Sequence, residues 1–263
     1  MWKIFSVILL SVLAASRPAP TPISVPKIPE GEVRVLKVAL SHKEKLSPGQ
    51  IITFNGSAKQ IETRIHWEGQ GADKYLVYTR AETLNNNCIS KYVLTFFPGP
   101  ELKMKNLDKT VTTPGGKVVQ REYYDFSDPA LKYPPILLHP FTLEIAFRSF
   151  EPTPGNRRAF NLWLNPMAVL KMEAVVGNTE EVTLSNGKKY KCYRIEMLPN
   201  IAEDFGVFAD KLFRPLAPSY VFWLSAEGSH PLVKYSGPMG QVSFVNAPIE
   251  THEMVSYTAG EGG

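Results

Sequence analysis

The sequence predicts a mainly β protein built on one antiparallel sheet that curls on itself. Three observations predict this fold. Short runs of alternating apolar and polar residues recur along most of the chain, and glycine- or proline-containing turns separate them. Neither an internal repeat nor a linker to a second domain interrupts the pattern. A sandwich of two sheets fits the same run of strands and is the alternative architecture.

The clearest predicted strand is Gln60–Glu68. Ile61, Thr63, Ile65 and Trp67 alternate there with polar residues, which is typical of a strand with one face in the core and one in water. Similar runs predict strands at residues 33–40, 74–81, 90–97, 117–125, 160–164, 168–176, 219–225, 231–236, 241–246 and 249–257.

One hairpin is specified by its turn. The segments 180–185 and 188–197 flank Asn186-Gly187, a dipeptide favoured in two-residue type I′ turns because both positions need positive φ. The apolar face of the outgoing strand shifts from Tyr190 and Cys192 to Tyr193 and the residues after it. A β-bulge and burial on both faces are the two explanations for that shift.

Two segments depart from the strand pattern. Within residues 199–213, apolar residues at helical spacing form the stripe Ile201, Phe205, Phe208 and Leu212, which predicts a short amphipathic helix. Residues 141–150 fit both a strand and a helix, so the sequence leaves that segment open.

The N-terminus predicts export. Lys3 precedes an apolar run from Ile4 to Ala15, and small residues follow it. Twelve helical residues span only about 18 Å, less than the ~30 Å hydrocarbon core, so a cleaved signal peptide fits better than a transmembrane helix. The predicted organisation is a signal peptide at 1–16, a proline-rich tether at 17–31, one β domain at 32–258 and a flexible tail at 259–263. The expected location is the periplasm or the exterior of a bacterial cell.

Composition and charge exclude several classes of protein. The 263 residues are 44% hydrophobic and 21% charged, with a net charge of +4. This balance excludes a wholly disordered or collagen-like chain and gives no reason to expect a nucleic-acid partner.

Cys88 and Cys192 are the two cysteines. In an oxidising compartment they could form a disulfide, which is one alternative. Two unrelated buried thiols are the other, because a free cysteine packs as a small hydrophobic side chain.

No recognised catalytic or metal-binding motif occurs in the sequence. It contains no phosphate-binding glycine loop and no Gly-x-Ser-x-Gly elbow. His252-Glu253 begins like a zinc-protease helix, but Ser256 stands where the second histidine is required. We therefore expect no metal, no cofactor and no catalysis.

Aromatic residues are the better functional signal. Tyr220–Leu224 is apolar on both faces, so one face needs a cover or lines a hollow. We expect the sheet and the 199–213 segment to enclose an apolar groove for an acyl chain or an apolar peptide. Its candidate ligand-binding residues are Trp67, Trp163, Ile201, Phe205, Phe208, Leu212, Phe222 and Trp223.

Residues 123–129, 176–182, 187–195, 220–224 and 230–235 resemble the motifs of exported bacterial proteins classified only as a domain of unknown function. In those proteins a hairpin leads into a cysteine-centred strand, here the strand around Cys192, and a later strand is followed by a proline-led strand. The resemblance implies a curved β half-barrel in the cell envelope, broadly like outer-membrane lipoprotein carriers. It brings no catalytic residues with it.

Three hypotheses follow for function. The first is an exported envelope protein that binds an apolar ligand, a lipid or a lipidated partner in a concave sheet without chemistry. The second is an envelope assembly protein that docks another protein through a sheet edge. The third is a hydrolase acting on an envelope polymer.

Overall fold

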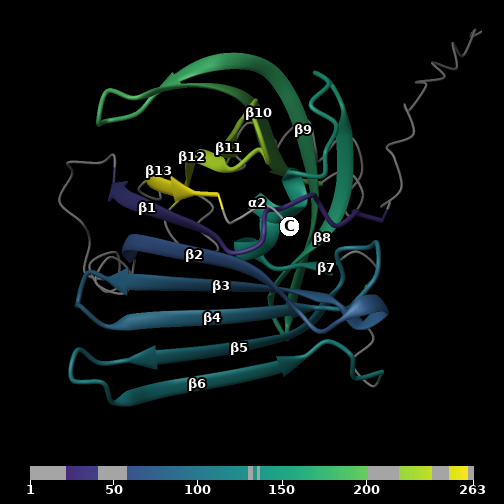
Figure 1. Cartoon of the computed structure of the whole chain (residues 1–263), viewed down its shortest axis with the longest axis vertical. Helices are drawn as coiled ribbons and strands as arrows, with labels where there is room; N and C mark the ends of the chain where they lie inside the picture. Colours follow the sequence, from purple (N-terminus) through teal and green to yellow (C-terminus); the bar gives the residue numbers. More distant parts are fainter. Residues whose placement is uncertain are drawn as a thin grey trace, which may run out of the picture.

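The computed structural model describes residues 22–40, 58–129, 133–134, 137–200, 219–238 and 249–259 (Figure 1). These residues form one 13-stranded sheet in the order β6-β5-β4-β3-β2-β1-β13-β12-β11-β10-β9-β8-β7. The strands are β1 (Glu32–Leu40), β2 (Ala58–Glu68), β3 (Tyr75–Leu84), β4 (Ile89–Phe96), β5 (Met104–Thr112), β6 (Val118–Asp125), β7 (Leu137–Leu138), β8 (Arg157–Asn165), β9 (Ala168–Thr183), β10 (Lys189–Pro199), β11 (Tyr220–Ser225), β12 (Leu232–Pro238) and β13 (Ile249–Thr258).

The structure confirms a mainly β chain with a single curved sheet. Neighbouring strands are antiparallel except β7 and β8, which pair in parallel. The sheet does not close, because β6 and β7 are its two ends and no described strand joins them. Thirteen strands make it larger than a simple half-barrel.

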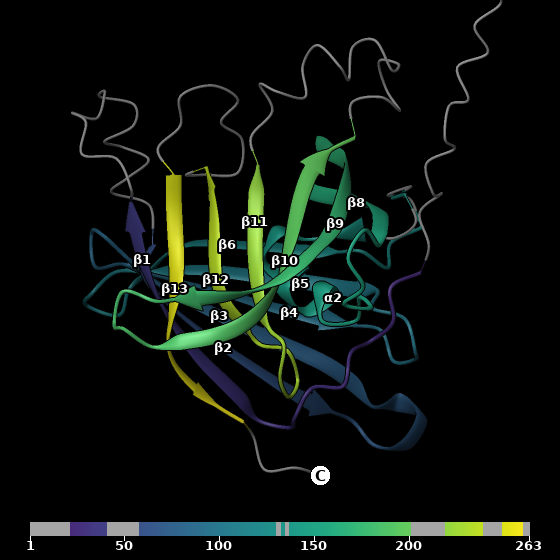
Figure 2. The same cartoon turned by 90° about the horizontal axis from the view of Figure 1, so that it is seen from above.

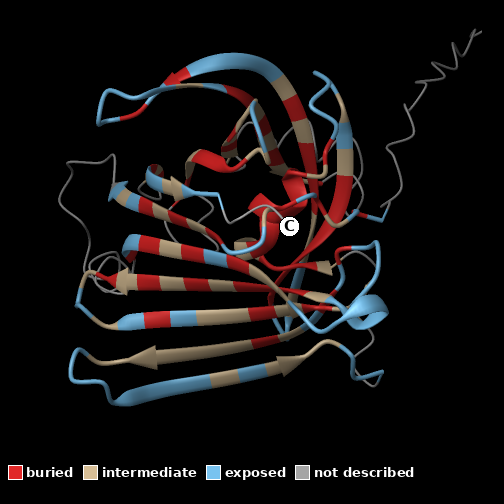
Figure 3. Ribbon diagram, in the orientation of Figure 1, coloured by how far each residue is buried: buried red, intermediate tan, exposed pale blue. Residues whose placement is uncertain are grey.

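A short helix fills the hollow of the sheet. A 3-10 turn at Pro140–Thr142 leads into α2 (Leu143–Phe147), and all five residues of α2 are buried. Of the two alternatives for residues 141–150, the helix is therefore the correct one. Figures 1 and 2 show α2 surrounded by the sheet, and Figure 3 shows that this centre is where burial is most complete.

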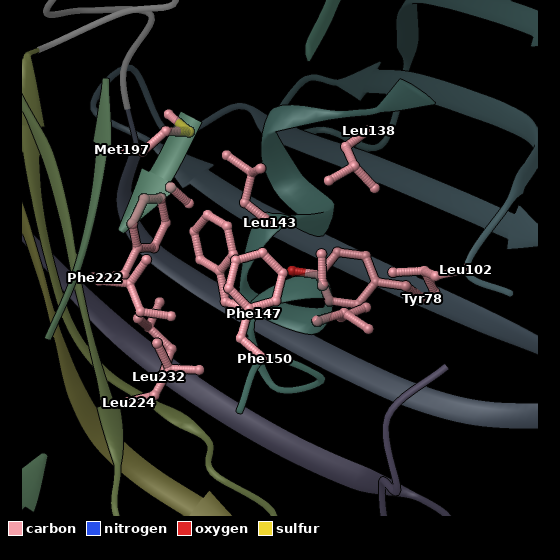
Figure 4. Packing of buried hydrophobic residues seen from close by; sticks show 14 of the residues in the cluster. Tyr78, Leu102, Leu138, Leu143, Phe147, Phe150, Met197, Phe222, Leu224 and Leu232 are labelled. Atoms are coloured by element: carbon pink, nitrogen blue, oxygen red, sulfur yellow. The ribbon is translucent and has the colours of Figure 1, made fainter. Parts of the chain in front are cut away.

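Aromatic side chains from α2 and its flank join the two walls of the barrel. The ring of Phe147 packs edge-on against Phe222 of β11, with 4.9 Å between centroids, and also contacts Phe150. Figure 4 shows these rings between Leu224 and Leu232 on one side and Tyr78 on the other. The helix and these aromatic side chains thus fill much of the interior with packed core.

The 180–197 hairpin forms as predicted, but its turn type was predicted wrongly. Gly187 has φ of +81°, whereas Asn186 does not have a positive φ. Backbone bonds run from Gly187 N–H to Leu184 O and from Leu184 N–H to Lys188 O, both 2.9 Å long. This is a three-residue loop in which only the last position is left-handed, so one glycine is enough.

The shift of the apolar face in β10 corresponds to burial on both faces, because the adjacent Cys192 and Tyr193 are both buried. The register of β10 against β9 slips between Tyr193 and Ile195, where two residues of β9 oppose one of β10. Gly177 lies in this bulge, and a Cβ there would be in ordinary contact with Arg194 O at 3.4 Å. The extra residue belongs to β9, so the alternation of side chains along β10 itself is kept.

The described part of the proline-rich segment is packed rather than a free tether. Ile23 and Ile28 are buried in the core cluster. Val25 N–H donates to Pro100 O at 2.9 Å, and Leu102 N–H donates to Ile23 O at 2.7 Å. Ile23 and Ile28, which stand among prolines in the sequence, give this segment apolar side chains to bury.

Several predicted segments lie outside the described residues: the signal peptide at 1–16, the stripe at 199–213 beyond Asn200, the strand at 241–246 and most of the tail at 259–263. Strand β5 was not predicted. Only Met104 and Leu107 of its nine residues are buried, so its apolar pattern is too sparse to read.

Candidate functional site

A cavity of about 280 Å³ lies inside the barrel, between α2 and the strands. It is at one end of the barrel, because its lining includes the first residues of β2 and β11 and the last residue of β12. The lining consists of Ala58, Arg80, Glu82, Tyr92, Pro140, Phe141, Leu143, Glu144, Leu162, Leu164, Met197, Tyr220, Phe222, Leu232, Tyr235, Pro238, Glu250 and His252.

One wall of the cavity is apolar. Leu143 of α2 faces Leu162 and Leu164 of β8 and Phe222 of β11 across it, and all four side chains are buried. Met197 of β10 lies beside Leu143 (Figure 4). This wall suits a hydrocarbon group, which gains free energy on leaving water.

Another part of the lining is polar, and it includes Arg80 and Glu82. Alternation along β3 turns both residues inward, where each is only 8% exposed. Arg80 Nε donates to Glu82 Oε1 at 2.6 Å, and the guanidinium lies 4.3 Å from the ring centroid of Phe141. Burial alone would lower the pKa of Arg80, but Glu82, Tyr78 and Glu144 together outweigh it and the pKa is raised. Arg80 is therefore a fixed cation at this wall.

The carboxylate of Glu144 in α2 is held by side chains of two strands, β3 and β1. Its Oε1 accepts from Tyr78 Oη at 3.0 Å and forms an ion pair with Arg34, whose side chain is fully buried. Burial alone would raise the pKa of Glu144, but the cations Arg34 and Arg148 together lower it. The carboxylate stays ionised and holds the helix against β1 and β3.

The third polar group comes from β12 and β13. His252 Nε2 and Glu250 Oε1 are hydrogen-bonded, and the imidazole packs 4.8 Å from the ring of Tyr235. Gly237 makes room for that tyrosine, because a Cβ at position 237 would overlap the Tyr235 hydroxyl. Burial, followed by the charge of Glu250, raises the pKa of Tyr235 well above its ordinary value.

The other titratable groups near the cavity keep their uncharged forms at neutral pH. Burial, followed by the charge of Glu82, raises the pKa of Tyr92 to about 12. Burial, followed by the charges of Arg80 and Lys109, lowers the pKa of His139 to about 3. The wall thus offers hydrogen bonds and paired ions. Among the described residues, no group of three histidine, cysteine or acidic side chains could hold a metal ion.

Of the predicted ligand-binding residues, Phe222 lines the cavity. Trp163 is buried elsewhere, packed against Phe126 and Tyr124 where the two ends of the sheet approach each other. Trp223 is on the outer surface, where its indole N–H donates to Glu180. Trp67 contacts Lys74, whose Nζ lies 5.4 Å from the centroid of the indole ring. Ile201, Phe205, Phe208 and Leu212 lie outside the described residues.

The sequence reasoning missed Arg80, Glu82 and Glu144. The signal for Arg80 was present, because the predicted strand at 74–81 places it on the same face as the apolar Leu76 and Tyr78, whereas Glu82 lies beyond that predicted strand. A charged residue at an inward position of a strand marks a buried partner or a site. Glu144 had no such signal, since its segment fitted two periodicities.

The two cysteines are free thiols. Cys192 is buried in β10, and burial, followed by the charge of Glu180, raises the pKa of its thiol to about 12. Cys88 directly precedes β4, which is seven positions from β10 in the order of the strands. The disulfide alternative is therefore not the one seen in the structure.

No family model and no curated protein matches the chain. One solved structure with a similar course of the chain is a beta-barrel-like protein of the domain of unknown function DUF1849 from Brucella abortus, with a TM-score of 0.47 and 10% sequence identity. The match covers 89% of this chain and 100% of that one. At this level the likeness assigns neither ligand nor activity. Separately, none of the described helices has the length and apolar character needed to cross a bilayer.

Proposed function

We propose that this protein binds the apolar part of an amphiphilic molecule in its interior cavity and does no chemistry on it. The observation that carries the proposal is the cavity of about 280 Å³ with one apolar and one polar wall. Pockets that bind small molecules usually combine apolar lining with a few convergent polar groups. A space of this size takes on the order of ten methylene groups, each about as large as a water molecule.

We further propose that the protein acts outside the cytoplasm, in the bacterial envelope. Support for this comes from the sequence, in which Lys3 and the apolar run from Ile4 to Ala15 have the pattern of a signal peptide. An exported binding protein with an apolar cavity suits the carriage or sensing of a lipid through an aqueous compartment.

The binding proposal is tested with N-phenyl-1-naphthylamine, an uncharged probe that fluoresces in apolar surroundings. Ala58 lines the cavity, so Ala58→Phe fills part of it. The control is Val169→Phe on β9, where the side chain is 37% exposed and outside the cavity lining. We expect probe affinity to fall at least about tenfold in Ala58→Phe, a loss of ~1.4 kcal/mol, and to stay unchanged in Val169→Phe.

Circular dichroism and thermal unfolding verify that both variants fold. Equal affinity in the wild type and a folded Ala58→Phe variant would refute the proposal, as would the absence of probe binding to the wild type. An equal loss of probe affinity in both variants would mean that the probe binds outside the cavity, and this result would also refute the proposal.

A further inference from the structure

On the polar wall of the cavity, Arg80 has N–H donors that meet no acceptor among the described residues. Arg80 is 8% exposed, and its Nε is used by Glu82. Neither terminal nitrogen of Arg80 has a hydrogen-bond partner among the described residues, although the side chain lines the cavity. A guanidinium carries five N–H donors, and unused buried donors cost free energy. The stacking on Phe141 and the bond to Glu82 hold these donors in place for an acceptor that enters the cavity.

The same wall also offers an acceptor. The bond from Arg80 uses only Oε1 of Glu82, and Oε2 of that carboxylate has no partner among the described residues. A donor and an acceptor thus stand side by side on β3, both facing the cavity. A group that both accepts and donates satisfies them together, and a hydroxyl is the smallest such group.

The charges beside Arg80 are already balanced by the protein. At the position of the head group, among the described residues, Arg80 pairs with Glu82, and the neighbouring Glu144 pairs with Arg34. A charged head group would therefore enter a buried site without a counter-ion, and burying an unpaired charge is expensive.

We propose that the ligand is an amphiphile with an uncharged, hydroxyl-bearing head, which accepts a hydrogen bond from Arg80 and donates one to Glu82 while its apolar part occupies the wall of Leu162, Leu164 and Phe222. This inference rests on the proposed function, because it assigns the ligand class of the same cavity. It excludes fatty acids and alkyl amines as preferred ligands.

The first experiment compares three ligands with the same chain. Decan-1-ol, decanoate and decylammonium each compete with N-phenyl-1-naphthylamine at pH 7.5 on the wild-type protein. We expect decan-1-ol to bind at least about tenfold more tightly than either ion, since an unpaired buried charge costs more than ~1.4 kcal/mol. Equal or tighter binding of either ion overturns the inference, as does the failure of all three to displace a bound probe. If the probe itself does not bind, it is the proposed function that fails.

The second experiment changes the charge of the wall by one. Glu82→Gln keeps an oxygen for Arg80 Nε but removes the negative charge, so decanoate should gain affinity relative to decan-1-ol. Glu62→Gln is the matched control, because Glu62 pairs with Arg64 on the outer face of β2 and lies outside the cavity lining. A ligand ranking that is the same in the folded Glu82→Gln and Glu62→Gln variants overturns the inference.

A double variant keeps the test decisive if Glu82→Gln does not fold. Arg80→Met with Glu82→Gln leaves the wall without a net charge and without guanidinium donors. We expect the folded variant to lose affinity for decan-1-ol by about tenfold. Unchanged decan-1-ol affinity in this variant contradicts the role of Arg80.

Discussion

Arg148 and Glu32 form a two-pronged ion pair inside the barrel, although 116 residues separate them. Arg148 Nη1 donates to Glu32 Oε2 at 2.8 Å, and Nη2 donates to Oε1 at 2.6 Å. The side chains are 0% and 1% exposed. Arg148 caps the end of α2, whereas Glu32 begins β1, so the pair fixes the helix to the wall of the sheet.

This pair predicts a difference between single and double variants. Arg148→Met leaves the Glu32 carboxylate buried without its counter-ion, and we expect the free energy of unfolding to fall by about 3–5 kcal/mol. Arg148→Met combined with Glu32→Gln removes both charges and should recover a large part of that loss. Urea denaturation measures both. If the double variant is as unstable as Arg148→Met, the cost comes from lost packing and not from the unpaired charge.

His139 predicts a loss of stability in mild acid. Its folded-state pKa is about 3 because of burial, followed by the charges of Arg80 and Lys109. Its unfolded pKa is ~6.5, so below pH 6.5 only the unfolded chain takes up this proton. The contribution of neutral His139 to the free energy of unfolding is therefore complete above pH 6.5. It falls by about 1.4 kcal/mol per pH unit as the pH drops toward 3.

The His139 effect is isolated by comparing the wild type with His139→Asn between pH 6.5 and 5. His139 Nδ1 accepts from the Phe141 N–H at 3.2 Å, and an asparagine oxygen can take over that bond. We expect urea denaturation to show a smaller loss of stability with falling pH in the variant. Identical pH profiles for the two proteins would mean that His139 titrates normally in the folded state.

The turn between β5 and β6 offers two adjacent glycines with opposite expectations. Gly116 has φ of +83° with nothing near its missing Cβ, so Gly116→Ala should cost about 1–2 kcal/mol from backbone strain alone. Gly115 does not have a positive φ, and its Cβ would lie 4.0 Å from Thr113 Oγ1. Gly115→Ala should therefore be neutral or stabilise by up to about 1 kcal/mol through the unfolded state. Thermal unfolding distinguishes the two, and similar effects at both positions would contradict the assigned backbone.

Aromatic packing should protect the open side of the sheet. Phe126, just past β6, contacts Trp163 of β8 edge-on with 5.2 Å between centroids, and no backbone pairing joins those two strands. Phe126 is half-buried, so we expect Phe126→Ala to cost about 1–2 kcal/mol, less than for a fully buried phenylalanine. Hydrogen exchange should quicken in β6 before it quickens in β3. Val118→Ala, at the exposed start of β6, is the control, and equal exchange in both variants would refute a closing role for the contact.

The alternation of apolar and polar residues was enough to predict those strands that have one apolar face. The segment 60–68 lies within β2, and Asn186-Gly187 marks the β9–β10 turn at the right place. Turn type was missed because Asn-Gly fits both a two-residue loop and the end of a three-residue loop. Strand β5 was missed because most of its side chains are not buried, so nothing in its composition distinguishes it from a loop.

The sequence by itself determined that the chain forms many antiparallel strands with tight turns, since alternation and turn residues act over a few neighbours. Only the tertiary structure decided what fills the hollow and which residues face it. In β1 the inward positions hold Glu32 and Arg34, whereas Val33 faces outward. Burial of these two charged side chains is stable because Glu144 of α2 and Arg148 at its end neutralise them. These partners are more than a hundred residues away in the sequence, so no local pattern indicates them.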